Sequence, residues 1–297
     1  MKHILFITLL IFIFCNTGKC QSHFIDSIIV IRHLDSLEGK IKVYYSPGQQ
    51  QKAMRYQSLF KDATFFYEQH YHTKFNYKVA ILDSAQWITE KYPFGFLAYD
   101  SGWLFIPAIV NAPFFKQING LKDGDKAYEN FLKEKGLTTQ SISDDFYLTL
   151  SLHELGHYFT IDNQRTIVPD MFAAELIATY FAYSFLQRIN HPALKTLIEF
   201  SRFAKSNYQP SYRHISAMDT LYIKMPIQNF RWFHRNIVLL AQQIYSQSGL
   251  TFMDYYLNAF KEDTPNSFTT QQVIDVLDKK CNGTVNKWAT ELAGTER

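Results

Sequence analysis

Apolar residues recur with two different periods along the chain, and the change in period separates a strand-rich first part from a helix-rich second part. Three short runs of β-branched or aromatic residues predict strands: residues 27–31, 40–45 and 77–82. Residues 49–70 carry apolar side chains at helical spacing and predict a helix. After about residue 125 the pattern is mostly helical. This order predicts an α+β fold, with the sheet first and the helices after it.

A hairpin is predicted near the end of the strand-rich part. Residues 96–99 and 103–106 are apolar, and they flank the turn sequence Asp100-Ser101-Gly102. The chain has no internal repeat, no low-complexity tract and no linker rich in proline and glycine. We therefore expect one domain over residues 21–297.

The first twenty residues have the pattern of an export signal. A basic residue, Lys2, precedes an apolar run at 4–14. As a helix this run would span about 16 Å, roughly half the hydrocarbon core of a bilayer. Gly18 and Cys20 are small residues at the −3 and −1 positions of a cleavage site. We expect removal of residues 1–20, no membrane span afterwards, and a secreted or periplasmic location.

Composition narrows the classes of partner. The chain has 297 residues, of which 47% are hydrophobic, so it can bury a sizeable core. The net charge is +3 and the basic residues are scattered, which argues against nucleic acid as a partner. Cleavage after Cys20 would leave Cys281 as the lone cysteine, so no intramolecular disulfide is expected. Oligomeric state is not addressed by these patterns.

One motif carries recognisable chemistry. Residues 153–157 read His-Glu-Leu-Gly-His, an H-E-x-x-H pattern. On a helix, His153 and His157 share one face one turn apart, so both imidazoles can reach one zinc ion. Glu154 is offset by one residue and faces a metal-bound water instead. Ser143 is the expected N-cap of this helix, because two acidic residues and an apolar stripe follow it. The alternative to a metal site is that the two histidines have a purely structural role on this helix.

A third ligand is expected on the next apolar segment. Residues 171–186 predict a helix in which Glu175 is the sole carboxylate. Because burial of an unpaired carboxylate costs free energy, Glu175 should be paired or coordinated. Small residues recur at spacing four and would let this helix approach the histidine helix: Ala174, Ala178 and Ala182. The alternative is a glutamate on the solvent side of the helix.

H-E-x-x-H followed by E-x-x-A-x-Y resembles the gluzincin zinc metallopeptidases, which have a thermolysin-like catalytic domain. The matching residues are His153, Glu154, His157, Glu175, Ala178 and Tyr180. The resemblance implies Zn²⁺ as the cofactor and a peptide or protein as the substrate. It also implies that residues 102–107 form the edge strand that binds extended peptide by strand addition.

The resemblance further implies a mechanism. His153, His157 and Glu175 would hold the zinc ion, and Glu154 would act as general base. Gluzincins also use a Tyr or His downstream of the glutamate ligand to stabilise the oxyanion. The candidates are Tyr208, Tyr212, His214, Tyr222 and His234. Residues 228–247 resemble the long helix that follows this donor, which favours His234 or Tyr222.

Two other readings stay open. The chain could be a catalytically silent peptide- or protein-binding domain on a zinc-peptidase fold. The intact Glu154 argues against this, because a binding domain has no need of a general base. A purely structural zinc site is the second alternative, but such sites usually take four protein ligands, often cysteines. The sequence therefore favours an exported zinc metallopeptidase.

Overall fold

The chain is α+β and divides into two compact units at Val110. The structure, a computed structural model, describes residues 34–88, 95, 97–100, 102–164, 166–222, 224–262 and 268–294. The predicted signal at 1–20 and the predicted strand at 27–31 lie outside these ranges. The domain extent of 21–297 stays a prediction.

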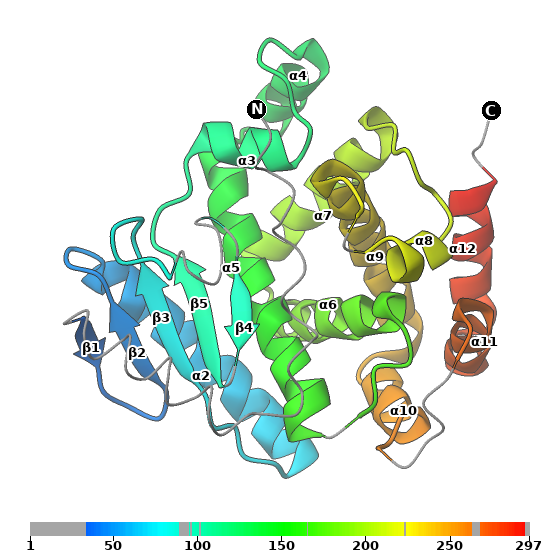
Figure 1. Ribbon diagram of the computed structural model, residues 1–297, viewed down its shortest axis with the longest axis horizontal. Helices are drawn as coiled ribbons and strands as arrows, with labels where there is room; N and C mark the ends of the chain where they lie inside the picture. Colours follow the sequence, from blue (N-terminus) through cyan, green and yellow to red (C-terminus); the bar gives the residue numbers. More distant parts are fainter. Residues whose placement is uncertain are drawn as a thin grey trace. The chain divides into compact units, whose positions relative to one another are not determined.

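The first unit contains a mixed sheet (Figure 1). Its described strands are β1 (Asp35–Leu37), β2 (Lys42–Tyr45), β3 (Lys78–Leu82), β4 (Ala98–Asp100) and β5 (Trp103–Pro107). Their order across the sheet is β1-β2-β3-β5-β4. The central strands β2, β3 and β5 run parallel, and the two outer strands are antiparallel to their neighbours. The strands predicted at 40–45 and 77–82 are confirmed as β2 and β3.

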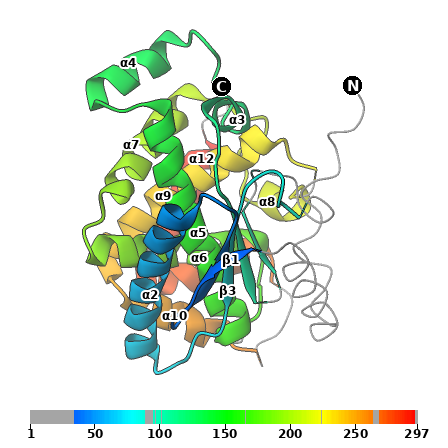
Figure 2. The ribbon, with the colours of Figure 1, turned by 90° about the vertical axis from the view of Figure 1, so that its left-hand side faces the viewer.

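Apolar side chains cover both faces of this sheet. Helix α2 (Gln50–Tyr71), predicted over 49–70, packs against β2, and Figure 2 shows it running along the strands. The helix buries one stripe: Ala53, Tyr56, Phe60, Ala63 and Tyr67. A second apolar cluster gathers alternate strand residues and two tryptophans: Ala80, Leu82, Trp87, Ile88, Ala98, Trp103 and Phe105. Alternation along β3 therefore places Val79 and Ile81 on the opposite face from Ala80 and Leu82.

The predicted hairpin is confirmed, but the predicted edge strand is wrong. Strands β4 and β5 pair antiparallel, with Asp100 opposite Trp103. Strand β5, which covers most of residues 102–107, also pairs with β3 through Leu104 and is an interior strand. The described edge on this side is β4. The run Trp-Leu-Phe-Ile-Pro is buried throughout, and a continuous apolar run suits a strand that has neighbours on both sides.

The second unit is helical. Its elements are α3 (Ala112–Ile118), α4 (Lys126–Lys135), α5 (Thr139–His157), the π-helix η1 (Tyr158–Asn163), α6 (Met171–Arg188), α7 (Pro192–Asn207), α8 (Ser216–Thr220), α9 (Ile227–Ser248), α10 (Thr251–Ala259), α11 (Thr270–Cys281) and α12 (Thr284–Ala293). Helix α5 packs on α6 and α7, and α9 packs on the same two helices (Figure 1). In the described part of the chain no helix has the length and apolarity needed to cross a bilayer. Cys281 is a buried free thiol.

Helix α5 begins earlier than the sequence suggested. The Thr138 hydroxyl accepts a hydrogen bond from the Ser141 amide, and the Ser141 hydroxyl accepts one from the Thr138 amide. This reciprocal capping box fixes the start of the helix. The prediction of Ser143 as N-cap is wrong, because Ser143 is buried inside the helix and its Oγ has no hydrogen-bond partner among the described residues. In the sequence, the acidic pair after Ser143 made that residue the stronger candidate for the N-cap, and the capping pattern at Thr138 was not recognised.

Substitutions at Thr138 and Ser143 distinguish the observed N-cap from the predicted one. Thr138→Ala should destabilise the protein by about 0.5–2 kcal/mol, because an orphan helix amide loses its acceptor. Ser143→Ala should be neutral or stabilising, because it removes a buried hydroxyl that has no partner. Denaturant unfolding of both variants measures the difference. A larger loss of stability in Ser143→Ala than in Thr138→Ala would contradict the observed cap.

Helix α6 begins at a buried acid. The Asp170 side chain accepts a hydrogen bond of 2.7 Å from the Ala173 amide, whereas its Oδ2 has no hydrogen-bond partner among the described residues. Burial, together with the nearby charge of Asp219, raises the pKa of Asp170 to about 7. The folded chain therefore holds a proton on Asp170 over a pH range in which the unfolded chain releases it.

This shift predicts a pH-dependent loss of stability. Below pH 4 the acid is protonated in both states. Between about pH 4 and 7 the unfolded chain releases the proton that the folded chain keeps, so wild-type stability falls across this window and is constant above it. Asp170→Asn keeps the acceptor for Ala173 but does not ionise. The variant should therefore gain stability relative to wild type as pH rises from 4 to 8, by a few kcal/mol at most. Unfolding curves at fixed ionic strength measure this, and a constant difference across the range would refute the shift.

Candidate metal centre

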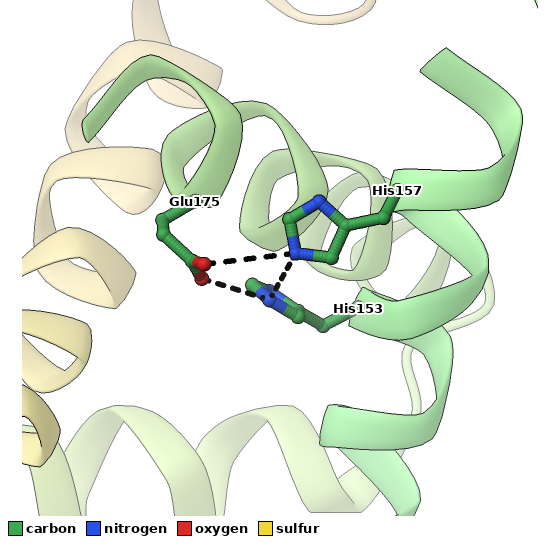
Figure 3. A group of neighbouring side chains, drawn as sticks. All are labelled: His153, His157 and Glu175. Carbon is green, nitrogen blue, oxygen red and sulfur yellow. Dashed lines mark hydrogen bonds and ion pairs between the residues drawn. The ribbon is translucent and has the colours of Figure 1, made fainter. Parts of the chain in front are cut away.

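Two neighbouring helices bring the predicted ligands together. The last turn of α5 carries His153 and His157, and the second turn of α6 carries Glu175 (Figure 3). Both imidazoles and the carboxylate point toward one another in this view. Helix α5 then continues directly into the π-helix η1. Such π turns inside helices occur frequently at functional sites.

The donor atoms form one tight group. His153 Nε2 lies 3.1 Å from His157 Nε2 and 3.1 Å from Glu175 Oε2. His157 Nε2 lies 3.8 Å from Glu175 Oε1. All the donor atoms lie within 4.8 Å of one another, and His153 and Glu175 are buried. The separations suit one ion, because donors about 2.1 Å from a tetrahedral centre lie roughly 3.4 Å apart.

A glycine lets the two helices come this close. A Cβ atom on Gly156 would lie 2.9 Å from both the Cα and the carbonyl oxygen of Ala178. It would also lie 3.0 Å from Phe181 Cβ. The predicted role of small residues on α6 is thus borne out at Ala178. The matching small residue on α5 is Gly156, the fourth position of the H-E-x-x-H motif.

Further side chains hold the ligands in place. His153 Nδ1 lies 3.1 Å from the Thr179 hydroxyl, which fixes the ring on the side away from the carboxylate. The Tyr222 hydroxyl donates a hydrogen bond of 3.0 Å to Glu175 Oε1. His234 Nε2 lies 3.0 Å from Glu175 Oε2, although the contact does not have hydrogen-bond geometry. Glu175 therefore receives neighbours from α5, α9 and the segment before α9.

The protonation states suit a cation. Burial lowers the pKa of His157 to about 3 and that of His234 to about 4, so both rings are neutral at pH 7. Burial alone would raise the pKa of Glu175, but the surrounding imidazoles outweigh it and hold that pKa well below its usual value. Burial, and then the charge of Glu175, raises the pKa of Tyr222, which keeps its proton. Neutral imidazoles beside an ionised carboxylate are a metal-ligand set.

The chemistry of the group fits a metal ion. Within the described ranges, Glu175 Oε2 is buried without a hydrogen-bond partner. A cation bound at this oxygen would compensate its buried charge. No Lys or Arg forms an ion pair with Glu175 in the described part of the chain. His153, His157 and Glu175 could therefore hold a metal ion.

The other predicted residues fall into two sets. Glu154 is nearly buried on α5 and lies outside the three-residue donor group, as its offset from His153 requires. Of the five oxyanion candidates, Tyr222 and His234 contact Glu175. Tyr208 lies against Gly120 instead, as the 3.1 Å separation of its ring from a Cβ built there indicates. Tyr212 and His214 are exposed.

Two residues beside the metal group were not predicted from the sequence. Thr179 follows Glu175 by one helical turn, so its hydroxyl shares the face of α6 that meets α5. That spacing could have identified it. Arg231 is buried three residues before His234, and its electrostatic neighbours include Glu154 and Glu175. A lone arginine in a helix carries no pattern that distinguishes it from a surface residue.

Comparison with known proteins adds no relative. No family model, curated protein or solved structure gives a significant match to this chain. The resemblance to gluzincins rests on the motif residues alone and stays a prediction. The geometry of His153, His157 and Glu175 is therefore the main indication of function.

Gly156 offers a direct test of the helix contact. Gly156→Ala should destabilise the protein by roughly 1–3 kcal/mol, although alanine is the better helix former, because the new methyl group meets backbone atoms of Ala178. The helices must separate, so metal affinity should fall with stability. Denaturant unfolding and metal titration measure the two effects. A variant with unchanged stability and metal affinity would show that the close approach is not required.

Proposed function

We propose that this chain is an exported zinc metallopeptidase of the gluzincin type, with a thermolysin-like catalytic domain. The observation that carries the proposal is the buried group of two imidazoles and one carboxylate on consecutive helices. The proposed substrate is a peptide or protein. The proposed location is the periplasm or the exterior of the cell, in keeping with the signal pattern at 1–20.

Zinc is the metal that suits this ligand set. Imidazole nitrogens with one carboxylate are common zinc donors, whereas Mg²⁺ and Ca²⁺ prefer sets made of oxygen atoms. Three protein ligands leave one position for water, which is the arrangement of catalytic zinc sites. Structural sites close all four positions with protein ligands, often cysteines, and the sole described cysteine, Cys281, lies on α11.

The residues of the chain supply the proton transfers. A bound zinc ion would lower the pKa of a water molecule to about 7 and polarise a peptide carbonyl. Glu154 takes the proton from the attacking water and passes it to the leaving amine. Tyr222 or His234 donates a hydrogen bond to the carbonyl oxygen as that oxygen gains negative charge. The buried setting of the group strengthens these interactions.

A catalytically silent binding domain on the same fold is the alternative. It would keep the ligands but have no need of a base at position 154. Glu154, the residue after His153, is nearly buried and keeps the carboxylate that a general base requires, which favours the enzyme.

The same substitution at two glutamates tests the proposal. Glu154→Gln should keep zinc at one per chain and lose hydrolysis, because an amide does not accept the proton. Glu175→Gln should lose most of its zinc affinity and therefore also lose hydrolysis, because a ligand is replaced by a much weaker one. Metal analysis after equilibration in a zinc buffer, with hydrolysis of a labelled unfolded protein, gives both readouts.

Two outcomes would count against this assignment. Full zinc content in Glu175→Gln would show that another residue supplies the third ligand. Hydrolysis by Glu154→Gln at the wild-type rate would show that Glu154 is not the general base. A wild-type protein that binds zinc but hydrolyses nothing, with or without a chelator as control, would favour the silent binding domain.

The oxyanion donor is tested separately. Replacing the true donor by Tyr222→Phe or His234→Ala should lower kcat about 10²–10³-fold while the zinc content stays unchanged. A residue that only positions Glu175 should instead lower zinc affinity, since both side chains contact that carboxylate. Kinetics with metal analysis of each variant distinguish the roles. Full activity in both variants would exclude both as donors.

A further inference from the structure

Helix α9 carries two buried arginines one turn apart. Arg231 and Arg235 are 6% and 2% exposed. Over the ranges that the structure describes, neither guanidinium has a carboxylate within ion-pair distance. Arg231 has Glu154 and Glu175 among its electrostatic neighbours, whereas the charge that Arg235 senses most is that of Arg231. Arg235 is therefore a buried cation whose main electrostatic neighbour carries a charge of the same sign.

Neutral groups surround Arg235. Its guanidinium lies 4.5 Å from the ring centroid of Phe146 and 4.7 Å from that of Phe200. Its Nη2 donates a hydrogen bond of 2.7 Å to Asn119 Oδ1. Its Nε is buried without a hydrogen-bond partner among the described residues. Aromatic faces and an amide oxygen stabilise a guanidinium but do not neutralise it, and arginine does not lose its proton in proteins.

A small, partly open cavity adjoins this cation. It offers about 30 Å³ of water-accessible volume between α5, α6, α7 and α9. Arg235 lines it, together with hydroxyl and imidazole groups at Thr149, Thr179, Tyr183, His153 and His234. The remaining lining is apolar, and the lining contains no acidic residue. About 10–15 Å³ suffices for one water molecule, so the space admits one small ion.

The cavity is distinct from the metal group. His153 borders both, and its two ring nitrogens face different partners. Its Nε2 lies against His157 and Glu175, whereas its Nδ1 lies against the Thr179 hydroxyl, which lines the cavity. Neither His157 nor Glu175 lines the cavity.

We propose that this cavity binds a small monovalent anion, with chloride as the physiological ligand, beside the Arg235 guanidinium. A buried cation without a counter-charge is strongly unfavourable, and an anion in the adjoining space compensates it. A water molecule in this space would leave the charge of Arg235 uncompensated. The proposal does not depend on the peptidase function.

Thermal unfolding of the full, metal-free chain tests this site. Chloride replaces gluconate stepwise at constant ionic strength, in the presence of a chelator. The melting temperature should rise with chloride, by about 2–3 °C at ten times the dissociation constant, because the ion binds only the folded chain. Arg235→Gln keeps an amide donor for Asn119 but carries no charge, so it should lose this dependence. Arg188→Gln, at an exposed arginine at the end of α6, should retain it.

A wild-type protein that melts at the same temperature in chloride and in gluconate would overturn the proposal. So would a full chloride response in Arg235→Gln. If that variant does not fold, wild-type crystals soaked in bromide decide the matter. An anomalous peak in the cavity beside Arg235 supports the site, and a cavity that holds water alone contradicts it.

Discussion

The ionised carboxylate of Glu175 is the group on which the second unit of this protein depends. It lies on a helix whose other buried residues are almost all apolar, and its Oε2 has no hydrogen-bond partner among the described residues. A charge in such surroundings persists only where something compensates it. The side chains that converge on it are two histidines from α5, a third histidine from α9, and Tyr222. His153, His157 and Glu175 in this arrangement could hold a metal ion.

The close contact of α5 and α6 follows from this requirement. A glutamate side chain is short, so its helix must lie near the histidine helix for one ion to contact all three ligands. Gly156 and Ala178 permit that approach, and Thr179 then reaches the far nitrogen of His153. The same packing leaves Arg235 buried beside a cavity on the other side of that imidazole. The candidate metal ligands and the buried charge of Arg235 therefore lie close to each other in one helical core.

Much of this site could be predicted from the sequence because it depends on local spacing. The H-E-x-x-H pattern places His153 and His157 on one helical face, and a single carboxylate in an apolar helix singles out Glu175. The start of α5 and the edge of the sheet were predicted wrongly. The start depends on a reciprocal hydrogen bond at Thr138, and the edge depends on which strands pair. Contacts between distant segments, such as Arg235 with Asn119, leave no periodic trace in the sequence.

The central claim is that His153, His157 and Glu175 bind zinc as a three-ligand site. X-ray absorption at the zinc edge, on protein purified without added metal and analysed for metal content, tests this most directly. The account predicts one zinc ion per chain, with two imidazole nitrogens and one carboxylate oxygen at about 2.0–2.2 Å, and a further light ligand from water. A protein that holds no zinc after exposure to it, or a spectrum that shows sulfur ligands, would contradict the account.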